Sequence, residues 1–272
     1  MIAANLPDID VLVFATGVPP VSFRRGWTHG VLAQLVLPLV LTAVMAWVGS
    51  RRTPRGPHGP PVSIGWLFLL SLVGVYSHVF LDYLNNYGVR VLSPIDWRWF
   101  YGDAVFIIDP WLWLMLGFGV WLARRTHRPA PAIAALVCAV VYVGGMLASA
   151  RTSRVLVVDA WTRSHGSPPT ALMVGPQPVT PFSRAIIIDA GEHYRTGTFA
   201  WPSAQMQLTD QRVLKSEGGA DVQRAREAPS VRAFLVWSRF PFWTVEQTPA
   251  GRRVTVRDMR FGDRFSASTI VH

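Results

Sequence analysis

The first half of the chain is built from long apolar runs separated by short polar segments. Four such runs cover residues 31–49, 64–81, 105–123 and 130–150. Each is close to the ~20 residues that an α-helix needs to cross a bilayer. We therefore predict an α-helical membrane protein with about four transmembrane helices. The third run fits this pattern least well, because it contains Asp109 and Pro110.

The pattern changes after residue 150. Short β-branched and apolar runs follow, separated by Pro, Gly and Ser: "RVLVVDAW" (154–161), "RAIIIDAGEHYRTGTFAW" (184–201), "VRAFLVWSRFPFW" (231–243) and "RRVTVRDMRF" (252–261). Such runs are typical of strands, and "TPAGRR" (248–253) is a hairpin-turn pattern. The sequence thus predicts a helical membrane domain at 1–150 and a C-terminal β-rich soluble domain at 151–272.

Positive charge in the loops predicts the orientation. "SRRTPRGPHGPP" (50–61) and "ARRTHRPAP" (123–131) are two short Arg-rich loops on one side of the predicted bundle, and such loops are usually cytoplasmic. The opposite side then holds residues 1–30, residues 82–109 and everything after about 150. We expect a multi-pass protein of the bacterial inner (cytoplasmic) membrane with its C-terminal domain outside the cytoplasm.

Composition supports a membrane protein and excludes other classes. The 272 residues are 50% hydrophobic and 15% charged, with a mean hydropathy of +0.28. The net charge is +10, but the basic residues are spread over loops without interleaved aromatic side chains, so we expect no nucleic acid partner. The single cysteine, Cys138, lies in the fourth apolar run and offers neither a disulfide nor a thiolate metal site.

Acidic residues in the first 150 positions are sorted to one side of the predicted membrane. This part contains no glutamate, and its aspartates are Asp8, Asp10, Asp82, Asp96, Asp103 and Asp109. All of them fall on the predicted outer side, together with His29 and His78, whereas His58 and His127 lie in the basic loops. Ionisable groups at or within membrane helices are costly and indicate a functional site.

The spacing of His78 and Asp82 in "SHVFLDYLNNYG" (77–88) is the most informative detail. Residues i and i+4 share one face of a helix, so both side chains can reach one metal ion. Imidazole and carboxylate groups are suitable ligands for zinc, manganese or iron. The same spacing also fits a hydrogen-bonded pair at a helix end. Asp8 and Asp10 could equally be loop or N-cap residues, and Asp109 before Pro110 is also an N-cap pattern. Asp96 could be a solvated loop acid.

Four motifs together resemble a known family. "NLPDID" (5–10), "RRGWTHG" (24–30), "SHVFLDYLNNYG" (77–88) and "YGDAVFIIDPWLW" (101–113) are similar to the YdjM-like family of LexA-regulated, inner-membrane metal-dependent hydrolases. The resemblance covers about residues 1–125, with a looser echo at 175–199. Members of that family resemble the zinc phospholipase C and single-strand nuclease superfamily, which implies phosphoester hydrolysis by analogy of fold.

The resemblance assigns roles to individual residues. It implies that Asp8, Asp10, His29, His78 and Asp82 bind metal or act in catalysis, with Asp103 and Asp109 as supporting metal-site residues. The family pattern also has an additional apolar helix with a Thr-His pair ahead of "NLPDID", whereas this sequence starts at Met1, close to that motif. We therefore expect either an upstream start or a chain with one helix and one ligand fewer.

These features lead to a functional hypothesis with alternatives. We predict a membrane-bound hydrolase with a divalent metal, zinc being favoured, held by His29, His78 and Asp82 while Asp8 or Asp10 bridges a second ion or acts as the catalytic base. A site at the membrane surface favours a lipid-linked or other phosphoester substrate, whose headgroup Arg24 and Arg25 could neutralise if they are not lipid contacts. The alternatives are an ion-binding transporter or proton-relay protein without hydrolase activity, and a membrane anchor for the C-terminal domain.

Overall fold

A computed structural model describes residues 1–16, 23–52 and 63–271. The Arg-rich loop at 50–61, with His58, lies almost entirely outside the described residues. The chain forms two compact units, one of residues 1–83 with 87–101 and the other of residues 84–86 with 102–272. Each unit is described by itself.

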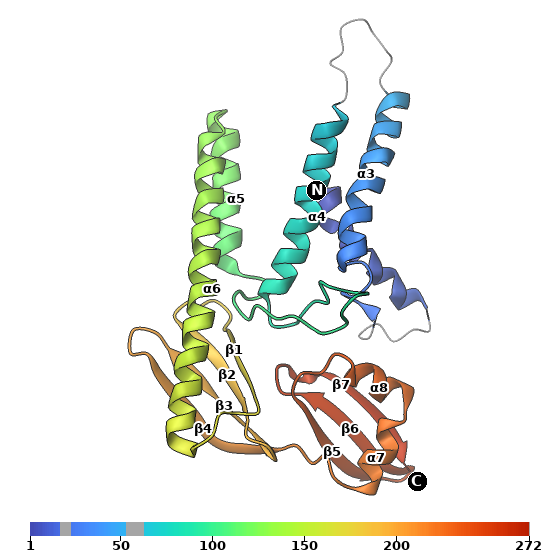
Figure 1. Ribbon diagram of the computed structural model, residues 1–272, viewed down its shortest axis with the longest axis vertical. Coiled ribbons are helices and arrows are strands. Elements are labelled where there is room, and N and C mark those ends of the chain that lie inside the picture. The colour runs from blue at the N-terminus through green and yellow to red at the C-terminus, as the bar shows by residue number, and fades with distance from the viewer. Residues whose placement is uncertain (17–22, 53–62, 272) are drawn as a thin grey trace, which may run out of the picture. The chain divides into compact units, whose positions relative to one another are not determined.

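The first unit holds two long apolar helices and the N-terminal segment. Its elements are α1 (Ile2–Asn5), the 3-10 helix η1 (Pro7–Ala15), α3 (Val31–Arg52) and α4 (Ile64–Leu84), shown in blue and cyan in Figure 1. Gly74 allows α1 to pack closely on α4, because a side chain there would collide with Ala3. The loop at 87–101 is tied to the start of α3 by a hydrogen bond from the Val31 amide to the Ser93 carbonyl (3.0 Å).

Two helices of the second unit pack against each other, the shorter one along the N-terminal half of the longer one (Figure 1). They are α5 (Pro110–Thr126) and α6 (Ala130–His165). Gly119 of α5 lets the backbones approach, since a side chain there would collide with Ala135.

The third apolar run forms a shorter helix than we predicted. Residues 105–109 are not helical, because the Asp109 carboxylate caps the helix and Pro110 is its first residue. Within the described residues, three helices, α3, α4 and α6, are long and apolar enough to cross a membrane.

Helix α6 corrects a second prediction. It continues past residue 150, where we placed the domain boundary, and ends at His165 with Gly166 in the left-handed conformation. The run "RVLVVDAW" is therefore helical and not a strand. Its buried side chains, with those just before it, recur every three or four positions, as a helix packed on one face requires: Met146, Ala150, Ser153, Val157 and Trp161.

An antiparallel sheet covers the C-terminal half of α6 (Figure 1). Its strands are β1 (Ala171–Pro176), β2 (Ser183–Asp189), β3 (His193–Ala200) and β4 (Gln205–Leu214), in that order. One face packs Ile186, Ile188 and Phe199 against Val157 and Trp161 of α6. The other face is also buried, since Met173, Ile187 and Tyr194 pack with Phe240.

A second antiparallel sheet completes the unit. It consists of β5 (Pro241–Thr248), β6 (Gly251–Asp258) and β7 (Gly262–Val271), preceded by α7 (Ala220–Arg226) and α8 (Pro229–Leu235). The first part of "VRAFLVWSRFPFW" is thus the helix α8, and only its end is a strand. "TPAGRR" is the predicted hairpin turn, with Thr248 paired to Gly251. The prediction of a β-rich C-terminal region is confirmed as two antiparallel sheets.

Candidate metal site

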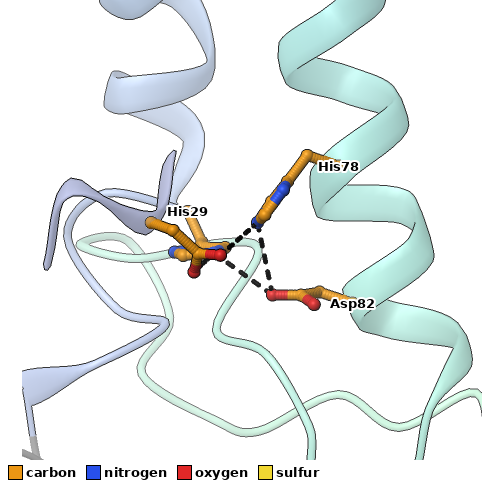
Figure 2. Close-up of side chains that lie close together, drawn as sticks. His29, His78 and Asp82 are labelled. Carbon is orange, nitrogen blue, oxygen red and sulfur yellow. Dashed lines mark ion pairs between the residues drawn. The ribbon is translucent and has the colours of Figure 1, made fainter. Parts of the chain in front are cut away.

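Three segments of the first unit bring four of the predicted ligands together. Asp8 comes from η1. His29 comes from the loop before α3, and His78 and Asp82 come from successive turns of α4 (Figure 2). Each residue offers one ligand atom, and these four atoms all lie within 4.8 Å of one another. The predicted convergence of the i, i+4 pair on α4 is therefore seen in the structure, and two further segments contribute to the same point.

The distances in this cluster suit a small cation. His29 Nε2 is 3.2 Å from Asp82 Oδ2, and His78 Nε2 is 3.7 Å from the same oxygen. Asp8 Oδ2 lies 3.7 Å from His78 Nε2, and Asp8 Oδ1 lies 3.9 Å from His29 Nε2. Ligand atoms at about 2.0–2.2 Å from a tetrahedral zinc ion would lie about 3.3–3.6 Å from each other. The four distances given above, 3.2–3.9 Å, are close to that range, and the wider separations in the group, up to 4.8 Å, would have to shorten when an ion binds.

Three of the atoms in the cluster are buried and unsatisfied. His29 Nε2, His78 Nε2 and Asp82 Oδ2 are inaccessible to solvent and have no hydrogen-bond partner among the described residues. A buried polar atom without a partner destabilises the folded state, and such atoms are uncommon in native proteins. Three of them facing one point indicate that a ligand, best a cation, satisfies all three.

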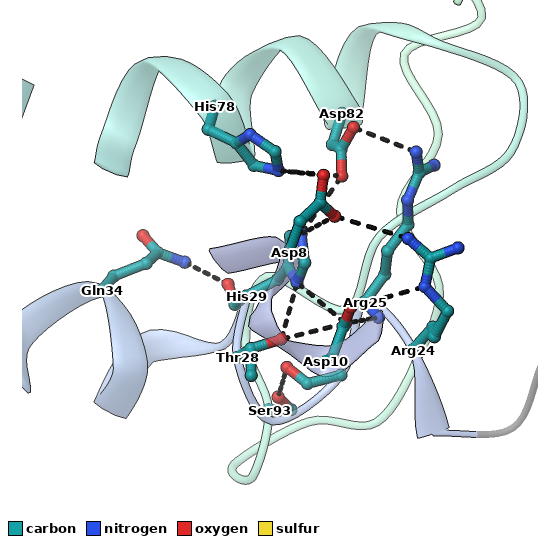
Figure 3. Close-up of polar contacts among 11 residues, drawn as sticks. Asp8, Asp10, Arg24, Arg25, Thr28, His29, Gln34, His78, Asp82 and Ser93 are labelled. Carbon is teal, nitrogen blue, oxygen red and sulfur yellow. Dashed lines mark hydrogen bonds and ion pairs between the residues drawn. The ribbon is translucent and has the colours of Figure 1, made fainter. Parts of the chain in front are cut away.

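A hydrogen-bonded chain sets the orientation of His29 (Figure 3). The Thr28 hydroxyl donates to Asp10 Oδ2 (3.0 Å), because a carboxylate can only accept. Its single proton is then used, so the 3.0 Å contact between Thr28 Oγ1 and His29 Nδ1 requires Nδ1–H to donate. In the neutral imidazole, His29 Nε2 then carries a free lone pair, and this is the nitrogen that faces His78 and Asp82.

Asp10 therefore lies behind the cluster and outside the four-residue group. Its Oδ2 also accepts from the Arg25 amide (2.8 Å), and its Oδ1 lies 3.4 Å from Arg24 Nε. Each carboxylate oxygen is thus engaged away from the ligand atoms. The four-residue group does not include Asp10, whose position fits a residue that holds a ligand in place.

Arg24 and Arg25 form ion pairs with two aspartates of the four-residue group. Arg25 Nη2 is 3.1 Å from Asp82 Oδ1, and the Arg25 guanidinium also lies over the Tyr87 ring. Arg24 Nη2 is 3.5 Å from Asp8 Oδ1. The two arginines balance the charge of the gathered aspartates, a role that the sequence hypotheses of headgroup binding and lipid contact did not include.

Asp103 has partners within the second unit. Arg239 Nη1 contacts both of its carboxylate oxygens, at 3.0 and 2.9 Å, and Arg184 donates to its backbone carbonyl. Burial lowers the pKa of Arg184 to about 10, although the charge of Asp103 acts in the opposite direction. Asp103 thus takes part in a partly buried ion pair, and the four-residue group does not include it.

Asp109 is also engaged elsewhere. Its Oδ1 accepts from the amides of Trp111 and Leu112, and its Oδ2 accepts from the Tyr142 hydroxyl (3.0 Å). The N-cap alternative for Asp109 is therefore confirmed.

Comparison with known proteins identifies the family. The sequence profile described as YdjM inner membrane protein matches residues 1–152. The chain belongs to the YdjM inner membrane protein family. This match includes every residue of the candidate metal site, and it confirms the resemblance carried by the four sequence motifs. It also places the protein, with its several apolar helices, among inner membrane proteins.

Two curated proteins are distant relatives of this YdjM-family chain. It is 34% identical to "Inner membrane protein YbcI" of Escherichia coli (strain K12) over 113 residues, 41% of this chain and 56% of the relative. It is 25% identical to "Uncharacterized protein YfhP" of Bacillus subtilis (strain 168) over 144 residues, 52% of this chain and 40% of the relative. The chain thus spans about half the length of these relatives. No solved structure matches it.

Sequence reasoning missed Thr28 and the ion pairs of Arg24 and Arg25. All three lie within "RRGWTHG", next to His29, so their proximity to a ligand was visible in the sequence. Their contacts were not, because those of Thr28 and Arg24 depend on the placement of η1, a segment that is 14 to 18 positions distant in the sequence. The ion pair of Arg25 depends on the placement of Asp82 in α4.

Proposed function

We propose that this protein is a membrane-bound, metal-dependent hydrolase that acts on a phosphoester or lipid-linked substrate at the membrane surface. The convergence of three buried, unpaired ligand atoms on one point carries this proposal. Two imidazoles and two carboxylates in a small cluster suit zinc, which commonly takes four nitrogen, oxygen or sulfur ligands.

The four ligands differ in exposure, and this suggests different roles. The side chains of His29, His78 and Asp82 are 0%, 15% and 13% exposed, whereas that of Asp8 is 43% exposed. We assign the three less exposed residues, His29, His78 and Asp82, to holding the cation. Asp8 lies where water can reach the site, and we assign it as the general base or an exchangeable fourth ligand. We do not assign Asp10 as the base, because its oxygens contact the Thr28 hydroxyl, Arg24 and the Arg25 amide.

Each group then has a defined task in the reaction. A bound divalent cation would lower the pKa of a water molecule to about 7 and polarise a phosphoryl oxygen. The Asp8 carboxylate accepts the proton from the attacking water. Arg24, beside Asp8, is placed to stabilise negative charge on the substrate. His78 and Asp82 lie in the last two turns of α4, and a site near the end of an apolar helix favours a substrate held at the membrane surface.

The transporter hypothesis uses the same cluster without hydrolysis. Ion sites of secondary transporters usually lie near the bilayer midplane, between repeats or at broken helices. The cluster lies at one end of α4, and α4 is continuous from Ile64 to Leu84. These observations favour the hydrolase.

A hydrolysis assay distinguishes the two functions. The purified protein in detergent should hydrolyse bis(p-nitrophenyl) phosphate, lose this activity on chelation and regain it with zinc. Asp8→Asn should keep its metal and lose about 100-fold or more in rate, because a general base typically contributes 10²–10⁴-fold. Stoichiometric metal without hydrolysis of any phosphodiester or phosphomonoester tested would contradict the hydrolase and favour the ion carrier.

The hydrogen bonds that link Asp10 through Thr28 to His29 give a second expected result. Thr28→Val keeps the shape of the side chain but removes the acceptor for His29 Nδ1–H. We expect zinc affinity to fall about 10–100-fold, as is usual when the partner of a ligating histidine is lost. Competition with a fluorescent zinc chelator measures the change.

Thr126→Val is the matched control for this measurement. The Thr126 hydroxyl donates to the Leu122 carbonyl within α5, in the other unit. Equal zinc affinities of the two valine variants would show that Thr28 does not position His29.

A further inference from the structure

The second unit contains a pocket that the proposed hydrolase does not use. It has a volume of about 280 Å³ and lies at the C-terminal end of α6, beside β2, β3 and β4. The side chains that define its chemistry are Trp161, His165, Asp189, His193, Arg195 and Arg212. It is therefore lined by two arginines and two histidines but by a single acid.

The two arginines are opposite each other on adjacent strands of the sheet. Arg195 of β3 and Arg212 of β4 are directly paired in the antiparallel register, and the register shifts immediately after Arg195. Like charges in opposite positions of neighbouring strands destabilise a sheet. Neither arginine forms an ion pair with another described residue, so their repulsion is not balanced by the protein itself.

Arg195 also has an unused donor. Its Nη2 donates to the Thr209 carbonyl (2.8 Å), but its Nε is buried without a hydrogen-bond partner among the described residues. The acid of the pocket does not supply one, because the Asp189 carboxylate is held by Lys215 (2.9 Å) and by the Gly191 amide (2.9 Å). The pocket thus presents an excess of positive charge and an unpaired donor.

Two stacked rings, those of Trp161 and His165, form one side of the pocket. The Trp161 and His165 rings are stacked, with centroids 3.6 Å apart and planes inclined by 7°. Trp161 is buried in the core between α6 and the sheet. This side is therefore fixed by packing, which gives the pocket a defined shape.

We propose that this pocket binds a small phosphate-bearing anion through Arg195 and Arg212. A guanidinium group can donate two parallel hydrogen bonds to the oxygens of one phosphate. The charges of two arginines together match the double negative charge of a phosphate monoester. The volume accommodates a phosphate group with a small substituent, either a free metabolite or the headgroup of an anionic lipid. The proposal is independent of the metal cluster, because all of its residues belong to the second unit.

Calorimetric titration with inorganic phosphate tests this site in the full chain. The protein is purified in a phosphate-free detergent and treated with chelator, so that phosphate cannot bind to a metal ion. We expect saturable binding to the parent, about tenfold weaker binding to Arg212→Gln, and no measurable binding to the Arg195→Gln/Arg212→Gln double variant. Arg253→Gln is the matched control, since Arg253 is an exposed arginine of β6 in the other sheet.

The outcomes separate the sources of the anion and the alternatives. Competition by phosphatidic acid in mixed micelles would identify a lipid headgroup that carries a phosphate monoester, and competition by glycerol phosphate alone would identify a soluble ligand. The thermal midpoint of the ligand-free double variant should equal or exceed that of the parent, because a repulsion has been removed. The proposal is overturned if phosphate fails to bind the parent, if acetate binds as well as phosphate, or if Arg212→Gln and Arg253→Gln bind phosphate equally.

Discussion

Replacing His78 or Asp82 with alanine is expected to remove most of the bound metal from the protein while leaving its insertion into the membrane intact. Each substitution deletes one of the three buried ligand atoms that converge on the candidate site. The loss of affinity should exceed the about 10–100-fold that follows from losing an outer hydrogen-bond partner. Insertion should be unaffected, because an ionisable side chain is removed from an apolar helix. Metal analysis of the purified variants against a metal-bearing parent measures the effect.

The structural alternative for this pair predicts a different result. If His78 and Asp82 only form a hydrogen-bonded pair at a helix end, alanine should cost about 0.5–1.5 kcal/mol of stability with no change in metal content. His127 is the internal control, because it caps the C-terminus of α5 in the other unit. Unaltered metal content in both alanine variants would refute the assignment of these two residues as ligands.

The sequence predicted the α4 part of the site well, because helical periodicity alone places residues i and i+4 on one face. It could not distinguish Asp8 from Asp10. The two lie in the 3-10 helix η1, where residues two apart point about 120° away from each other, given three residues per turn. Only the docked orientation of η1 decides that Asp8 reaches the histidines and Asp10 reaches Thr28.

The supporting aspartates were harder to place. Asp109 precedes a proline and was equally consistent with an N-cap and with a ligand, and the local capping hydrogen bonds decide the matter. Asp103 carried no local signal of its partner, because Arg239 is 136 positions away in the sequence. A long-range ion pair of this kind depends on the tertiary fold and has no period or motif.

The secondary structure of "RVLVVDAW" (154–161) also could not be predicted from local sequence alone. Its β-branched residues indicated a strand, but a short apolar run does not distinguish a strand from a buried helix. Tertiary packing decides the outcome, because Val157 and Trp161 lie on one helical face against the first sheet. The neighbouring strands were predictable, since Ile186 and Ile188 belong to a run bounded by turn residues. The hairpin at Gly251 was predictable from its local turn chemistry.

The second large expected effect concerns stability and involves Asp258. Its carboxylate is fully buried beside the equally buried guanidinium of Arg260, with Arg260 Nε at 2.9 Å from Oδ1. It also accepts from the Ser238 hydroxyl (2.8 Å) and the Arg239 amide (2.7 Å). Arg260 in turn donates to the Asn86 carbonyl (2.9 Å). One carboxylate thus joins β6, the loop before β5 and the segment after α4 within the second unit.

We expect Asp258→Ala to destabilise the second unit by about 3–5 kcal/mol, the usual cost of leaving one charge of a buried pair without its partner. Burial alone raises the pKa of Asp258, but the charge and hydrogen bonds of Arg260 lower it by more, so the net pKa lies below the ordinary 3.8. A lowered pKa in the folded state means that this stabilisation is fully present above about pH 4 and is lost as the pH falls further.

Urea-dependent proteolysis of the full chain in detergent at neutral pH measures the difference in stability between Asp258→Ala and the parent. Asp263→Ala is the matched control, because Asp263 pairs with Arg257 at 2.8 Å but its side chain is 91% exposed, and exposed pairs contribute about 0–1 kcal/mol. Equal stability losses in the two variants would show that burial of the Asp258–Arg260 pair does not set its contribution.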